Sequence, residues 1–97
     1  MTALHKSVDR AERDSQFHVN LERRDPAMNM ARFYAIRIER TLFGQWAVIR
    51  QWGRIGTKGN ARSSWFDDLE AALAERDSRA QRKQGRGYLP ARIGALR

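Results

Sequence analysis

The segment RFYAIRIER, residues 32–40, decides the fold class because its polarity alternates. Tyr34, Ile36 and Ile38 share one parity, and a period of two places such residues on one face of a β-strand. The opposite face takes aromatic and charged side chains: Phe33, Arg37 and Glu39. The segment is therefore predicted to be a strand with one face in the core, and it is the clearest strand in the chain.

Three other segments extend this pattern on either side. Residues 17–22 alternate between apolar and polar side chains, which predicts a half-buried strand, and the Asp25-Pro26 turn follows them. Residues 45–52 form a further candidate strand after a turn at 42–44. Neither of its faces is purely apolar, so its orientation stays open: Trp46, Val48, Arg50 and Trp52 share one parity, and Ala47 and Ile49 share the other. Residues 61–66 are predicted to return and pair with it.

A helix is predicted after these strands. Asp67 provides an N-cap and Glu70 follows at the third position, the pattern of a capping box. The helix is expected to run to about Gln84 and to end at a left-handed Gly85. Strands followed by one amphipathic helix indicate an α+β domain, a small antiparallel sheet of about four strands with the helix across one face. The predicted core comprises Tyr34, Ile36, Ile38, Val48, Phe66, Leu69 and Leu73, with Ala72 and Ala80 also buried on the helix.

Length and composition exclude several classes of protein. The chain has 97 residues, 41% hydrophobic and 31% charged, which suits one globular domain. We expect a mobile N-terminal tail over residues 1–16, the domain over 17–89 and a C-terminal tail over 90–97. Since no apolar run approaches the roughly 18 residues of a membrane span and no secretory h-region is present, a cytoplasmic protein without a membrane partner is expected; its oligomeric state stays open.

Catalytic chemistry lacks the residues it needs. The chain has no cysteine and two histidines, His5 and His18, so neither a metal centre nor a cofactor is predicted. It contains no Gly-x-Ser-x-Gly elbow, and the glycines of residues 53–59 match neither a P-loop nor a Gly-x-Gly-x-x-Gly fingerprint. The paired Asp67 and Asp68 are explained by helix capping. The protein is therefore predicted not to be an enzyme.

The charge points to a polyanionic partner. The net charge is +8, and all of it belongs to residues 31–97, since residues 1–30 carry equal numbers of basic and acidic side chains. Residues 45–66 contain Arg50, Arg54, Lys58 and Arg62 without an acid. Arginine dominates the basic residues, and its planar fork suits bidentate contact with phosphate. Nucleic acid is the natural ligand class for such a surface.

Three tryptophans lie among these cations, at positions 46, 52 and 65. An indole in a small sheet usually fills the core, but Trp52 ends its strand beside Gly53, which leaves it open to stack on a base or sugar. Arg54 and Lys58 have an alternative interpretation as solvated loop charges. The cations of the last helical turns also have an alternative interpretation, since positive charges there complement the helix dipole. These cations are Arg79, Arg82 and Lys83.

The residues around Trp52-Gly53-Arg54 resemble the WGR domain, a module named after that tripeptide. The resemblance covers Phe17 to about Leu89 and rests on these stretches: Leu42-Phe43-Gly44-Gln45-Trp46, Arg50 to Gly59, Phe66, Ala71, Lys83 and Arg86-Gly87-Tyr88. It is closest to the single-domain, typically bacterial members of the family. It implies a small antiparallel sheet packed on one helix, in agreement with the periodicity.

The resemblance also implies a function. In poly(ADP-ribose) polymerases the module binds DNA near breaks, with the motif tryptophan on the sugar-phosphate of a terminal nucleotide. The motif arginine of those proteins contacts DNA or a neighbouring domain. By position, the resemblance assigns the role of the tryptophan to Trp52 and that of the arginine to Arg54. Since these 97 residues contain no zinc finger and no transferase domain, only nucleic-acid binding is carried over. The complete set of candidate nucleic-acid-binding residues is Arg50, Trp52, Gly53, Arg54, Lys58, Arg62, Arg82, Lys83 and Arg86.

DNA is the expected ligand, with ends or nicks as possible targets. Two alternatives stay open: an adaptor that docks an acidic protein partner through the same residues, and a module that binds RNA.

Overall fold

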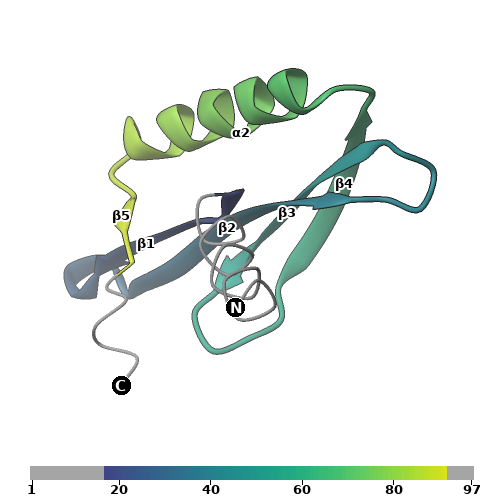
Figure 1. Cartoon of the computed structure of the whole chain (residues 1–97). Helices are drawn as coiled ribbons and strands as arrows, with labels where there is room; N and C mark the ends of the chain where they lie inside the picture. The colour runs from purple at the N-terminus through teal and green to yellow at the C-terminus, as the bar shows by residue number, and fades with distance from the viewer. Residues whose placement is uncertain (1–16, 92–97) are drawn as a thin grey trace, which may run out of the picture.

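The clearest predicted strand is the centre of the structure. A computed structural model describes residues 17–91 and shows β2 (Met30–Arg40) in the middle of a five-stranded antiparallel sheet of order β4-β3-β2-β1-β5 (Figure 1). The other elements are β1 (Val19–Asp25), a short 3-10 helix η1 (Pro26–Met28), β3 (Trp46–Arg54), β4 (Asn60–Phe66), α2 (Leu69–Gln84) and β5 (Leu89–Pro90). The α+β class is confirmed, and β5, which pairs with β1, is a strand that the sequence did not predict. The predicted tail at 1–16 lies outside the described residues, as do residues 92–97.

The helix covers one face of the sheet, and the register decides which side chains it covers (Figure 1). Paired residues of β2 and β3 point to the same face, and the pairs on the helix side are Tyr34 with Trp52, Ile36 with Arg50 and Ile38 with Val48. This settles the orientation of β3, because the parity of Val48 faces α2. Within residues 17–91 no α-helix covers the opposite face, which we call the open face, and Trp65 on it is 58% exposed.

The core lies between α2 and the middle strands. Its buried members are Leu21, Tyr34, Ile36, Ile38, Val48, Ala72, Ala80 and Tyr88. Six of the residues predicted to be buried are confirmed, four on the sheet and the two alanines on the helix, while Phe66, Leu69 and Leu73 are half-buried and pack against the margin of the core. Phe66 belongs to β4, an edge strand that the helix covers only partly. The small side chains of Ala72 and Ala80 let the helix backbone approach the sheet closely.

The N-cap of α2 lies one residue after the predicted one, and the helix ends at Gln84 as predicted, but the left-handed residue comes two positions after Gly85. Asp68, rather than Asp67, caps the helix, since its side chain accepts a hydrogen bond of 2.8 Å from the Ala71 N–H. Gly85 keeps a helical φ of −64°, and Gly87 takes the left-handed conformation at φ +97°. The Tyr88 N–H donates to the Lys83 carbonyl and the Gly87 N–H to that of Gln84, both at 3.1 Å. This is a Schellman motif, and it turns the Tyr88 ring into the core.

Two glycines, Gly53 and Gly59, let the loop after Trp52 return and pack closely against the end of β3. A side chain on Gly59 would place its Cβ 2.0 Å from the Trp52 carbonyl oxygen, and one on Gly53 would lie 2.7 Å from the Gly59 Cα. Gly59 also has a left-handed φ of +68°. The predicted glycine loop therefore brings residue 59 back against the end of β3, directly behind Trp52.

Gly59→Ala is expected to destabilise the domain severely, by at least about 3 kcal/mol in the free energy of unfolding, because a clash with backbone adds to the cost of a left-handed alanine. Chemical denaturation followed by circular dichroism measures this value. Gly44→Ala is the matched control: Gly44 has φ +86°, but its Cβ would meet nothing within 4 Å, so only the conformational cost of about 1 kcal/mol is expected. Equal losses of unfolding free energy in both variants would show that Gly59 is not packed tightly against the Trp52 backbone.

Candidate nucleic-acid interface

A cationic groove lies between the C-terminal half of α2 and the sheet. Its volume is about 200 Å³. Two aromatic and five cationic side chains line it: Tyr34, Arg50, Trp52, Arg79, Arg82, Lys83 and Arg86. Five cations around one small volume form an environment suited to an anion.

The floor of the groove comes from β2 and β3. Arg50 and Trp52 are two residues apart on β3, and Tyr34 pairs with Trp52 across the sheet. The Arg50 guanidinium carbon lies 5.7 Å from the centre of the Trp52 ring, and its Nε is buried without a hydrogen-bond partner among the described residues. Arg62 of β4 is directly opposite Arg50. Like charges in this arrangement repel one another, and among residues 17–91 neither arginine forms an ion pair with an acid.

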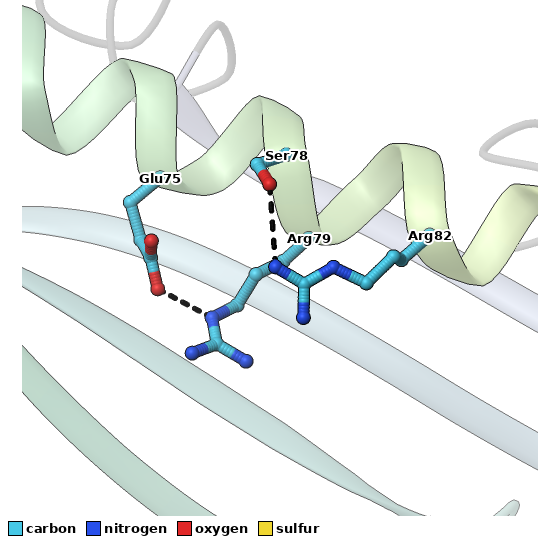
Figure 2. A network of polar contacts seen from close by, with 4 residues as sticks. All are labelled: Glu75, Ser78, Arg79 and Arg82. Atoms are coloured by element: carbon cyan, nitrogen blue, oxygen red, sulfur yellow. Dashed lines mark hydrogen bonds and ion pairs between the residues drawn. The ribbon is translucent and has the colours of Figure 1, made fainter.

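The wall of the groove comes from α2 and the turn after it. Arg79, Arg82, Lys83 and Arg86 follow at spacings of three and four residues, which gathers them on one side of a helical path. Figure 2 shows two of these side chains: the Arg79 Nε donates to Glu75, and an Arg82 guanidinium nitrogen lies 3.4 Å from the Ser78 hydroxyl. The bond to Glu75 raises the pKa of Arg79. Glu75 thus partly neutralises one of the five cations.

Lys83 lies closest to the aromatic rings. Its Nζ is 4.9 Å from the centre of the Tyr34 ring and 5.3 Å from that of Tyr88, so it contacts both by cation–π interactions. Burial lowers the pKa of Lys83 below its usual 10.5, and repulsion by Arg86, Arg32 and Arg50 lowers it further. The groove therefore already disfavours its own positive charge in the absence of an anion.

The groove unites five of the nine residues predicted from the sequence: Arg50, Trp52, Arg82, Lys83 and Arg86. Arg62 lies beside it on β4. Trp52 is half-buried rather than fully exposed, so it presents part of its indole. Tyr34 and Arg79 join the site although the sequence placed the first in the core and assigned the second to the helix dipole.

The other three predicted residues lie outside the groove. Arg54 is exposed and lines a separate hollow of about 250 Å³ together with Arg32 and residues 28–31. Lys58 is exposed on the glycine loop, and its carbonyl accepts a hydrogen bond of 2.7 Å from Gln51. Gly53 contributes its backbone, which packs against Gly59.

The described residues contain neither a candidate metal-binding cluster nor a membrane-spanning helix. Within residues 17–91 there is no group of three or more His, Asp or Glu side chains that could hold a metal ion. No helix of the same range is long and apolar enough to cross a bilayer.

Comparison with known proteins agrees with the fold and the motif. An uncharacterized protein of Sinorhizobium fredii, y4dW, is 43% identical over 74 residues, which are 76% of this chain and 36% of that protein. The chain thus spans about a third of the length of this relative. No solved structure matches the present chain. The model of the WGR domain family matches residues 17–95, and the chain belongs to that family.

Proposed function

We propose that the protein is a non-enzymatic DNA-binding module whose cationic groove holds the sugar-phosphate backbone. The observation that carries this proposal is the groove itself, in which five cations and two aromatic rings face one volume of about 200 Å³. The WGR domain is a non-catalytic module associated with nucleic-acid binding in poly(ADP-ribose) polymerase-like proteins. That association supports the same ligand class.

The shape of the groove favours a strand end or a nick. A volume of this size between a helix and a sheet is far too narrow for a duplex, so only a local part of one strand can enter it. Arg50, Lys83 and Arg86 then contact phosphate oxygens, and the half-buried Trp52 packs against the sugar or base that follows. Contacts to phosphate fix position without reading sequence, so little sequence preference is expected.

A titration panel tests the ligand class. Fluorescence anisotropy is measured with blunt, nicked, 5′-phosphorylated and dephosphorylated duplexes, single-stranded DNA and matched RNA, each at several salt concentrations. If about four cations neutralise phosphates, the slope of log affinity against log salt is roughly −3 to −4 for duplex DNA. Binding to RNA alone would assign the groove to RNA. The absence of binding to every nucleic acid at low salt would overturn the proposal and favour an acidic protein partner.

The first variant that tests the groove changes two arginines of its wall. Arg82→Gln with Arg86→Gln should weaken DNA binding by roughly tenfold or more and make the salt slope shallower by about 1.8, because two phosphate contacts are lost. The loss should be similar for unrelated sequences.

The matched control for this variant is Arg24→Gln with Arg37→Gln. It removes the same net charge from the opposite face of the sheet, where Arg24 pairs with Glu22 and Arg37 pairs with Glu39. We expect it to keep most of the affinity. Equal losses in the two double variants would mean that overall charge, and not the groove, holds the DNA.

The lowered pKa of Lys83 predicts a dependence on pH. Lys83 contributes to anion binding only while it is protonated, and its pKa lies below 10.5, so affinity should fall as the pH rises towards that value. Lys83→Arg stays charged over the whole range and should keep its affinity. Anisotropy titrations from neutral to alkaline pH at constant ionic strength measure both proteins, and a parallel decline in both would remove Lys83 as the titrating group.

A further inference from the structure

A second set of cations lies on the helix-side face of the sheet, beyond the groove. In the register of the three middle strands, Arg23 of β1 is directly opposite Arg32 of β2, and Arg32 is directly opposite Arg54 of β3. Opposed residues share a face, and this parity is also that of Tyr34 and Trp52. The three side chains therefore form a row across the strands, which we call the arginine row.

The charges of the arginine row are not balanced by ion pairs within the described part of the chain. Among residues 17–91, none of its three guanidinium groups forms an ion pair with an acid. Asp25 is the next residue of this parity on β1, and it is not paired with any of them. Like charges placed directly opposite one another across a sheet destabilise it. A row of three such residues costs stability unless an anion bridges them.

The arginine row continues the groove. Arg32 lies close enough to Lys83 to lower its pKa. Arg23 lies against the turn after α2, since a Cβ on Gly87 would be 3.3 Å from the Arg23 Nε. Arg54 lies two residues beyond Trp52 on β3. Along this strand guanidinium, indole and guanidinium thus alternate on one face, at Arg50, Trp52 and Arg54.

We propose that the arginine row is a second phosphate-binding site, which holds the phosphates that follow, along the same strand, those bound in the groove. Neighbouring strands are about 4.8 Å apart, so one phosphate can be bridged by two adjacent guanidinium groups of the row. This inference rests on the proposed function. It adds Arg23 and Arg32 to the interface. It also assigns Arg54 to phosphates further along the bound strand than the nucleotide that packs on Trp52.

The test compares two double variants that remove equal charge from the same two strands. Arg23→Gln with Arg32→Gln changes the row, and Arg24→Gln with Arg37→Gln changes the open face of β1 and β2. Binding of single-stranded DNA of increasing length is measured by anisotropy at several salt concentrations. The row variant should bind long oligonucleotides roughly tenfold more weakly, with a salt slope shallower by about 1.4. It should also gain less affinity with length than the natural sequence.

The outcomes separate the two proposals. If the natural protein binds DNA and the row variant has the affinity, salt slope and length dependence of the open-face variant, the second site is absent while the groove retains its function. If the natural protein binds no nucleic acid, the proposed function fails first. Thermal unfolding of both variants gives the folding control, and the row variant should be at least as stable as the natural sequence because repulsion has been removed.

Discussion

The register between β2 and β3 is the constraint on which both core and groove depend. It places Ile38 beside Val48 at one end of the helix-covered face and Tyr34 beside Trp52 at the other, with Ile36 and Arg50 between them. A shift of one residue would send every one of these β3 side chains to the open face. The apolar pairs hold the register against this shift, because their burial is lost when it changes. The position of Arg50 in the groove is thus fixed by its apolar neighbours.

The groove is stable only because other interactions compensate for its charge. Arg50 and Lys83 share a small volume with three further guanidinium groups, and the lowered pKa of Lys83 reports the resulting repulsion and desolvation. The rings of Tyr34, Trp52 and Tyr88 offset part of this cost, since each lies within about 6 Å of a cation. Among residues 17–91 Glu75 is the one acid that pairs with a cation of the groove, and such an excess of positive charge is typical of a binding surface rather than of a core, since a ligand supplies the missing charge.

The sequence predicted the central strands, the helix and most of the core, because their periods of two and about 3.6 residues are local properties. Five of the groove residues were also among the candidates, four of them from the cationic stretches and the resemblance, and Trp52 from its place at the end of a strand and from the resemblance. The sequence could not predict that Arg32 and Arg54 would be neighbours, since these residues are 22 positions apart in sequence and meet only through the pairing of β2 with β3. For the same reason Tyr88 was missed: its burial depends on the left-handed turn at Gly87. Side-chain partners across strands require the register, which local patterns leave undetermined.

The division of α2 into two halves explains why a small domain can carry such a surface. The first half has Glu70 in its first turn and buries Ala72, and Leu69 and Leu73 pack against the core, so it anchors the helix. The second half ends in cations, which the negative end of the helix dipole favours. The same dipole that stabilises Arg82 there also lowers the cost of gathering charge near β3. Placing the binding surface at the C-terminal end of the only long helix of residues 17–91 therefore limits its cost to the fold.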